Sequence, residues 1–173
     1  MKKAVLFLIN VFRRLRGKWY TFLTKRMLHS YESIGVNGYC KISSTAKVDV
    51  GKKVSFNGMR ICGQGEVRIG DYFHSGENVK IMLGSHDYDN ADKIPYSQAY
   101  TSKRVVIDDF VWVASDVIIS GNVHIGEGAI VAIGSVVVKD VPPYAIVGGN
   151  PATVIKYRDI EHFKALKQQA KFH

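Results

Sequence analysis

The segment from residue 107 to residue 141 reads IDDFVWVASDVIISGNVHIGEGAIVAIGSVVVKDV and repeats with a period of six residues. Counted from residue 107, every sixth residue is aliphatic and β-branched: Ile107, Val113, Ile119, Ile125, Val131 and Val137. The residue four positions after each of these is small or branched. No helix has a period of six, and an ordinary alternating strand would not run through glycines at this spacing. The pattern therefore predicts short strands that are joined by tight turns.

Three hexapeptides are expected to close one triangular coil, and successive coils are expected to stack through ladder hydrogen bonds. The aliphatic residues would then form columns inside the stack. The same frame recurs upstream, where hexapeptides start at Ile69, Ser75 and Ile81. Before residue 69 the register slips, because Val50 lies nineteen residues ahead of Ile69 and eighteen would be in phase. We therefore expect a one-residue insertion near residues 57–63.

Two further segments depart from the repeat. Residues 85–104, SHDYDNADKIPYSQAYTSKR, are polar and lack the period. A long loop inside a repeat array is usually functional, so we interpret this segment as an excursion loop that returns at Val105. Residues 159–172 show helical spacing of apolar residues, and a helix there is expected to cover the open end of the last coil.

The N-terminal segment differs from the rest in charge. Residues 1–30 contain eight basic residues and no acidic residue, and the remainder of the chain is nearly neutral. The apolar run from Ala4 to Ile9 is too short to span a membrane, and no signal-peptide cleavage site follows it. Aromatic and basic residues alternate from Trp19 onward, as suits a helical arm on an anionic membrane surface. A helix packed on the β-helix or on a neighbouring subunit is the alternative, and no nucleic-acid-binding motif is present.

These segments predict a mainly β fold with three parts. A basic amphipathic helical arm covers residues 1–34, a parallel β-helix with the loop at 85–104 covers residues 35–157, and a C-terminal helix covers residues 158–173. Cys40 and Cys62 lie far from any metal-binding spacing, so we expect reduced thiols in a cytoplasmic protein.

Residues 111–156 carry a resemblance to a known family. The segment VWVASDVIISGNVHIGEGAIVAIGSVVVKDVPPYAIVGGNPATVIK resembles the hexapeptide-repeat acetyltransferases, in particular the maltose and galactoside O-acetyltransferases, the streptogramin acetyltransferases and the bacterial polysaccharide O-acetyltransferases. The resemblance is strong over residues 66–157, weak over 35–65 and absent over 1–34. It implies a left-handed β-helix, a homotrimer, and acetyl-CoA as donor in the groove between neighbouring β-helices. The excursion loop of one subunit would help to close the site.

Within this resemblance, His86 in GSHDYD stands where the family places its catalytic histidine. An imidazole with a pKa of about 6.5 could take the proton of an acceptor hydroxyl, and no Ser or Cys nucleophile is evident beside it. Three other residues are candidates for acceptor binding. Asp89 completes His-x-x-Asp, Asn57 lies near an acceptor-binding Asn of sugar-acetylating relatives, and Trp112 matches the tryptophan of the family's VWIG element. The alternatives are an exposed loop histidine, a turn-forming Asp, a corner Asn and a Trp packed under the loop.

The resemblance also implies contacts to acetyl-CoA from the late coils. The residues that match are Ser115, Ile133, Gly134, Ser135, Lys139 and Lys156. Lys139 would lie near the nucleotide phosphates, where a cation has an electrostatic role, although solvated surface lysines are the alternative. Thr153 stands where sugar acetyltransferases often have Arg, which removes one charge from that site. His74 and His124 project from coils that could lie close together, but the sequence lacks His-x4-His and we expect no metal.

The sequence therefore predicts an acetyl-CoA-dependent O-acetyltransferase that acts on a sugar hydroxyl. The basic arm suggests a lipid-linked saccharide or surface-polysaccharide precursor at the cytoplasmic face of the membrane. Alternatives within this class are acetylation of a soluble sugar or antibiotic, and N-acetylation of an amino sugar. A zinc carbonic anhydrase of the gamma class and a non-catalytic trimeric scaffold are the alternatives from other classes.

Overall fold

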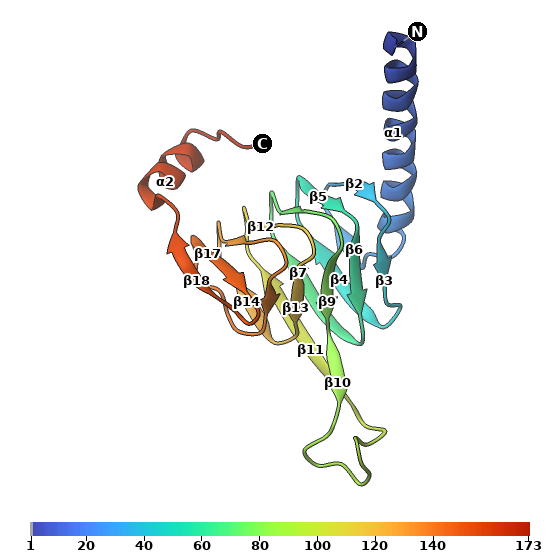
Figure 1. Ribbon diagram of the computed structural model, residues 1–173, viewed down its shortest axis with the longest axis vertical. Coiled ribbons are helices and arrows are strands. Elements are labelled where there is room, and N and C mark those ends of the chain that lie inside the picture. Colours follow the sequence, from blue (N-terminus) through green and yellow to red (C-terminus); the bar gives the residue numbers. More distant parts are fainter. Residues whose placement is uncertain (1) are drawn as a thin grey trace.

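The computed structural model of the chain describes residues 2–173, which form a parallel β-helix with a helix at each end and one long projecting loop (Figure 1). The prism has three sheets. The first sheet contains β1 (Ser30–Tyr31), β4 (Ala46–Val50), β7 (Gly65–Ile69), β11 (Tyr100–Ile107) and β14 (Val123–Ile125). The second contains β2 (Ile34–Gly38), β5 (Val54–Asn57), β8 (His74–Ser75), β12 (Trp112–Val113), β15 (Ile130–Val131), β17 (Ala145–Gly149) and β18 (Ala152–Tyr157). The third contains β3 (Lys41–Ile42), β6 (Met59–Cys62), β9 (Val79–Met82), β13 (Ile118–Ser120) and β16 (Val136–Val137).

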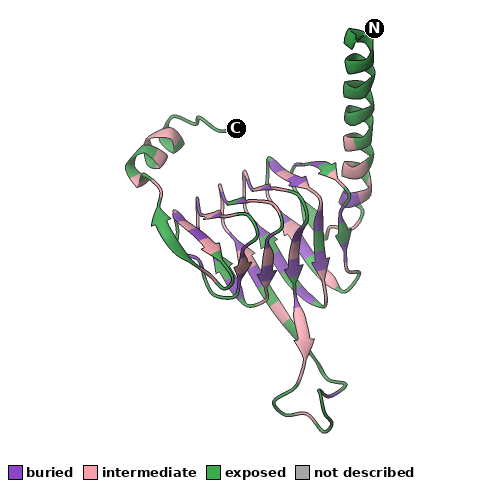
Figure 2. Ribbon diagram, viewed as in Figure 1, coloured by how far each residue is buried: buried purple, intermediate pink, exposed green. Residues whose placement is uncertain are grey.

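The aliphatic residues spaced by six form the interior of this prism. Consecutive coils pair eighteen residues apart, as in Ile107 with Ile125 and Val113 with Val131. All six residues of the repeat are at most 1% exposed, and Figure 2 shows buried and exposed positions alternating along the strands. Burial of each such side chain contributes about 1.5–3 kcal/mol relative to exposure. The predicted three-sided β-helix is confirmed.

The register slip is also present. Val50 pairs with Ile69, nineteen residues away, so the net insertion is one residue as predicted. The insertion lies at the corner after β6. There the interior residues Ile61 and Ile69 are eight positions apart, two more than the six-residue repeat requires. The preceding corner is one residue shorter, because interior Met59 follows Val54 by five.

The excursion leaves the prism at the corner between the third and first sheets. The chain departs after buried Leu83 and returns at buried Val105. Strand β10 (Gly84–His86) pairs antiparallel with the first part of β11, so the excursion begins as a two-stranded stalk below the prism (Figure 1). The expected loop is therefore present, but residues 100–104 are strand because their backbone finds partners in β10 and β7.

Helix α1 (Lys2–Lys25) is the predicted N-terminal helix, and its two ends differ. Residues 2–16 are exposed and project away from the prism (Figures 1 and 2). The C-terminal end packs on β2, where the Val36 amide donates to the Thr21 hydroxyl at 2.9 Å and Thr24 is buried. Strand pairing starts at Ser30, which lies beside Asp49, so the first coil begins inside the range expected for the arm.

Helix α2 (Ile160–Gln168) begins after Asp159, whose side chain accepts from the His162 amide at 2.9 Å. It does not cover the end of the last coil, which corrects the expectation above. Instead it runs along the corner between the first and second sheets, where Phe163 packs on Tyr144 and Phe110. The corner carries a row of aromatic rings, and this apolar surface holds the helix. The edge of β17 is covered by antiparallel β18.

Candidate functional site

His86 is the last residue of β10, at the point where the stalk opens into the loop. Its imidazole stacks on Tyr96, with centroids 4.2 Å apart, and meets Tyr100 edge-on at 5.4 Å. Within residues 2–173 its Nδ1 atom is buried and has no hydrogen-bond partner. A buried polar atom without a partner is uncommon in native folds and often marks a functional position.

The loop beyond His86 is ordered by Asp87, which the sequence did not single out. The Asp87 carboxylate accepts from the Asp89 amide at 3.1 Å and from the Asn90 amide at 3.0 Å. Its backbone also bonds to Ala99 and to Ser97 across the base of the loop. Asp89 itself is exposed. Asp87 is thus the residue that shapes the turn, through an Asx-type arrangement.

The two remaining acceptor candidates lie on the second sheet. Trp112 is 49% exposed on the outer face, in register with His74 on one side and Ile130 on the other. Asn57 ends β5, and its amide group donates to the Ser75 carbonyl oxygen at 2.7 Å. Its side-chain oxygen accepts from Asn37 at 3.1 Å. The Asn57 amide therefore joins three successive coils at their corner.

Four candidates for acetyl-CoA binding lie at the corner between the second and third sheets. Ile133 is 71% exposed there, and the Gly134 amide donates to the Ser115 carbonyl oxygen at 3.0 Å. The Ser115 hydroxyl accepts from the Glu77 amide at 3.0 Å. Ser135 differs from the others, because it is fully buried and its hydroxyl donates to the Ala132 carbonyl oxygen at 2.6 Å.

The two candidate lysines are exposed and lie elsewhere. Lys139 is at the corner between the third and first sheets, after β16, and Lys156 is on β18 opposite Ile146. Thr153 is on the same strand. One chain therefore places His86, Asp89 and Lys139 at or beyond one corner and Ser115 and its neighbours at another. Asn57, Trp112 and Lys156 lie on the second sheet. The structure does not bring these groups together within one protomer.

The two histidines considered for a metal lie on different sheets, which corrects the expectation that they could be close. His74 is on β8 of the second sheet, and His124 is on β14 of the first. His124 Nε2 lies 2.9 Å from Asp108 Oδ2. Within residues 2–173 no three His, Cys, Asp or Glu side chains are grouped in a way that could hold a metal ion.

Local electrostatics follow from burial. Burial, and to a smaller extent nearby His173, lowers the pKa of His74 below its usual value. Burial raises the pKa of the Cys40 thiol, and both cysteines are free. Neither helix of the described residues has the length and apolar content needed to cross a membrane.

No protein-family model matches the chain. A chloramphenicol acetyltransferase of Klebsiella aerogenes is 38% identical over 106 residues, which cover 52% of this chain and 50% of that protein. A galactoside O-acetyltransferase of Escherichia coli K12 is 27% identical over 162 residues, which cover 83% of this chain and 78% of that protein. The chain spans a quarter to a half of the length of the chloramphenicol acetyltransferases that it matches.

Solved structures of acetyltransferases have the same fold as this chain. A hexapeptide-repeat-containing acetyltransferase from Vibrio cholerae superposes with a TM-score of 0.64 and 27% identity, covering 78% of this chain and 77% of that chain. The complex of that protein with acetyl coenzyme A superposes with a TM-score of 0.60 and 25% identity, covering 78% and 74%.

Proposed function

Because the chain belongs to the hexapeptide-repeat acetyltransferase family, we propose that it transfers acetyl from acetyl-CoA to a hydroxyl group of a saccharide. The placement of His86 carries this proposal. The residue stands at the mouth of the excursion loop, is held by two tyrosine rings, and has one buried ring nitrogen without a partner. The galactoside O-acetyltransferase and the acetyl-CoA complex of the Vibrio cholerae protein support the choice of acceptor and donor.

His86 acts in this proposal as a general base. Its Nδ1 is buried, so the other ring nitrogen, Nε2, is the atom that an acceptor can reach. Nε2 takes the proton of the acceptor hydroxyl while the hydroxyl oxygen attacks the thioester carbonyl. The acetyl group passes from sulfur to oxygen, and the imidazolium returns the proton to the sulfur of coenzyme A. No acyl-enzyme is required.

The donor would be held by groups on the outer surface. Lys139 and Lys156 are exposed cations suited to phosphates, and Ile133 offers an apolar surface at the corner beside Ser115. The buried side chain of Ser135 and the paired amide of Gly134 are less suited to direct contact. Trp112 and Asp89 are the better candidates for contacts with the acceptor. The side-chain amide of Asn57 is already hydrogen-bonded to the Ser75 carbonyl oxygen at the corner.

A homotrimer would complete this site. The candidate groups lie on separate corners of one protomer, and the excursion tip exposes Ile94 almost fully. We infer that the loop of one subunit reaches the second sheet and its corner on the next, so that His86 and Trp112 of neighbouring subunits share one cleft. Mixing inactive His86→Ala and Trp112→Ala chains under subunit exchange tests this inference. Restored activity in the mixture supports the shared cleft. A mixture that is as inactive as each variant alone contradicts it.

Acetyl-CoA turnover tests the proposed activity. Thiol release should be measured for the wild type and for His86→Gln with a panel of mono- and oligosaccharides, amino sugars and chloramphenicol. We expect turnover with a saccharide and a loss of at least about a hundredfold in His86→Gln. The match to chloramphenicol acetyltransferases makes chloramphenicol the second candidate acceptor. Turnover that is equal in both proteins would remove His86 from the chemistry, and the absence of turnover with every acceptor would contradict the proposed function.

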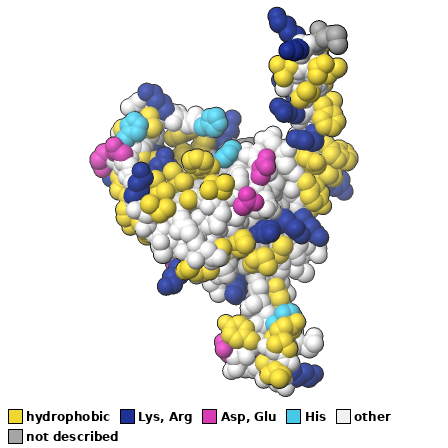
Figure 3. Space-filling view, viewed as in Figure 1, with side chains coloured by type: hydrophobic (Ala, Val, Ile, Leu, Met, Phe, Trp, Pro, Cys, Tyr) yellow, Lys and Arg dark blue, Asp and Glu magenta, His cyan; other side chains and the backbone are white. Residues whose placement is uncertain are grey.

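The exposed part of α1 supports a membrane-associated acceptor. Leu6, Phe7 and Leu8 are each more than half exposed, and Arg13 and Arg14 follow on the same segment. Figure 3 shows hydrophobic side chains gathered along this helix with basic side chains between them. An anionic lipid surface satisfies both kinds of side chain. We infer that α1 lies on the cytoplasmic face of the membrane and that the acceptor is a lipid-linked saccharide or surface-polysaccharide precursor.

Vesicle flotation tests this attachment. Deletion of residues 2–16 removes the projecting part of α1 and spares the end that packs on β2. The full chain should float with phosphatidylglycerol vesicles and not with phosphatidylcholine vesicles, and the deletion should abolish flotation. Replacement of Lys164 and Lys171 by Gln is the charge control, because these lysines lie outside α1. Continued flotation of the deletion variant would contradict the role of α1.

A further inference from the structure

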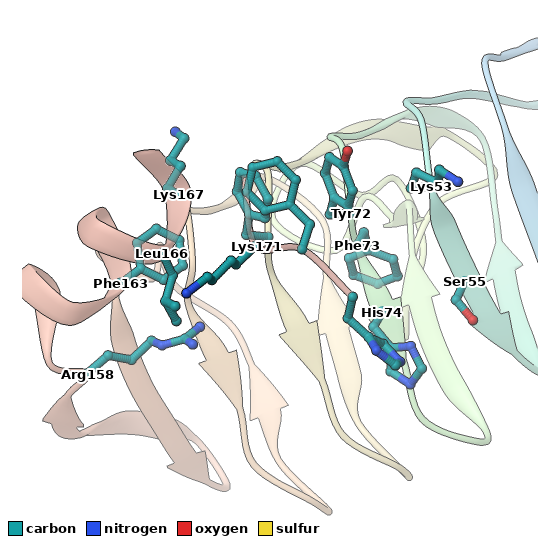
Figure 4. A pocket seen from close by; sticks show the side chains of 13 residues that line it. Lys53, Ser55, Tyr72, Phe73, His74, Arg158, Phe163, Leu166, Lys167 and Lys171 are labelled. Atoms are coloured by element: carbon teal, nitrogen blue, oxygen red, sulfur yellow. The ribbon is translucent and has the colours of Figure 1, made fainter. Parts of the chain in front are cut away.

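The C-terminal helix and tail enclose a cavity against the prism that contains none of the candidate site residues. Its volume is about 230 Å³, and it lies between α2, the tail that follows it and the row of aromatic residues at the first corner (Figure 4). Tyr72 and Phe110 stack with centroids 5.1 Å apart, and Phe172 of the tail packs on both rings. These three rings form one apolar wall of the cavity.

The titratable side chains that line the cavity include basic residues but no carboxylate. The lining residues include four Lys or Arg and two His, and no Asp or Glu. Lys167 is neutralised, because it pairs with Glu127. Arg158, Lys171 and Lys53 form no ion pair with any carboxylate of residues 2–173. The lining therefore contains three cations that are not in an ion pair, and of these Arg158 and Lys171 lie toward the same end of the cavity.

Arg158 is the most constrained of these cations. Its guanidinium lies over the ring of Phe163 at 4.9 Å, and its Nη1 donates to the Gly128 carbonyl oxygen at 3.0 Å. Burial lowers its pKa, which means that part of its hydration is lost without a counter-charge to replace it. In Figure 4 the side chain of Lys171 points toward the end of the cavity where Arg158 lies. A bound anion would compensate Arg158 for the lost hydration.

We propose that this cavity binds a phosphate monoester of a small apolar or aromatic molecule. Arg158 and Lys171 contact the phosphoryl oxygens, and the organic group lies against Tyr72, Phe110 and Phe172. A phosphoryl group fits better than a single carboxylate, because it carries up to two charges and three acceptor oxygens for several donors. The proposal is independent of the acetyl transfer proposed above.

Calorimetric titration of the full chain with phenyl phosphate, inorganic phosphate and phenol tests this site. Phenyl phosphate should bind more tightly than inorganic phosphate, because only the ester uses both the cations and the aromatic wall. Phenol should not bind measurably. A tenfold rise in salt concentration should weaken phenyl phosphate binding.

Substitutions of the lining residues test whether phenyl phosphate binds in this cavity. Lys171→Gln should weaken phenyl phosphate binding by about tenfold. Lys164→Gln changes a lysine of α2 that pairs with Glu161 outside the cavity, and it should bind like the wild type. Arg158→Gln should show the largest loss, and circular dichroism distinguishes this loss from unfolding of α2. Failure of the wild type to bind phenyl phosphate at millimolar concentration, or unchanged affinity in Lys171→Gln, would overturn the proposal.

Discussion

The imidazole of His86 lies nearly parallel to the phenol ring of Tyr96, with centroids 4.2 Å apart and planes inclined by 18°. Tyr100 meets the same imidazole edge-on, at an interplanar angle of 89°. Because Tyr100 pairs with His86 across the stalk and Tyr96 belongs to the loop, the two rings tie the orientation of the histidine to both parts of the excursion. The loop therefore positions the proposed base as well as covering it.

Removal of the Tyr96 ring should disorder His86 without unfolding the prism. We expect kcat of Tyr96→Ala to fall by about tenfold or more with little change in the KM for acetyl-CoA, because a misoriented base affects the proton transfer more than donor binding. Tyr96→Phe keeps the stacking ring and should retain activity within about twofold. Tyr88→Ala, a change of an exposed tyrosine in the same loop, is the matched control. Equal kcat values for Tyr96→Ala and the wild type would exclude a positioning role.

The second prediction concerns the stability that the aliphatic columns inside the prism provide. Ile119 is fully buried, whereas Ile133 is 71% exposed. Ile119→Ala should lower the free energy of unfolding by about 2–5 kcal/mol, because it leaves a cavity in a closely packed column. Ile133→Ala should change it by less than about 0.5 kcal/mol. Urea unfolding of both variants at one protein concentration measures the difference, and similar losses would contradict the assignment of the columns to the interior.

The columns could be predicted because their signal is local and repeated. Ile107, Val113 and Ile119 are constrained by the same geometry, so one period predicts them all. The excursion was predicted for the same reason, as the place where that period stops. The position of α2 was not predicted, although a signal existed. Tyr72, Phe110 and Tyr144 each follow a buried first-sheet aliphatic residue by three positions, which marks an aromatic corner.

The candidate site was predicted less completely than the fold. The partners of His86 come from a loop without a repeat, so no period placed Tyr96 beside it. Ser135 shows the opposite problem, because a match to family motifs did not reveal that its side chain points inward. Side-chain direction at the corners depends on the turn between strands, and the six-residue pattern does not report it.

The two cysteines should differ in reactivity. Cys40 is 3% exposed and burial raises its pKa, so both access and the thiolate fraction are reduced. Cys62 is partly exposed at the end of β6. In the native protein a disulfide reagent should modify the Cys62 thiol much faster than the Cys40 thiol. Cys62→Ser should therefore remove the fast phase of the reaction. Two equally fast phases in the wild type would show that the first coils open readily.

Acid should weaken the first coil through Asp49. Its carboxylate accepts from the Ser30 hydroxyl at 2.5 Å and lies 2.7 Å from His29 Nδ1. The Ser30 hydrogen bond, followed by that of His29, lowers the pKa of Asp49 below its usual 3.8. A carboxyl with a lower pKa in the folded state contributes stability above its unfolded pKa, and this contribution is lost as the pH falls through the folded pKa. The loss should therefore begin near pH 4 and continue below it.

Comparison of Asp49→Asn with the wild type isolates this contribution. The variant should be less stable than the wild type at pH 6, and the difference should shrink as the pH falls below about 4, because the protonated wild-type carboxyl then resembles the amide. Asp92→Asn, which changes an exposed residue of the excursion loop, should follow the wild type throughout. Urea unfolding midpoints from pH 3 to pH 6 measure the curves. A constant gap between Asp49→Asn and the wild type over this range would mean that Asp49 stabilises the coil through the geometry of its hydrogen bonds and not through its charge.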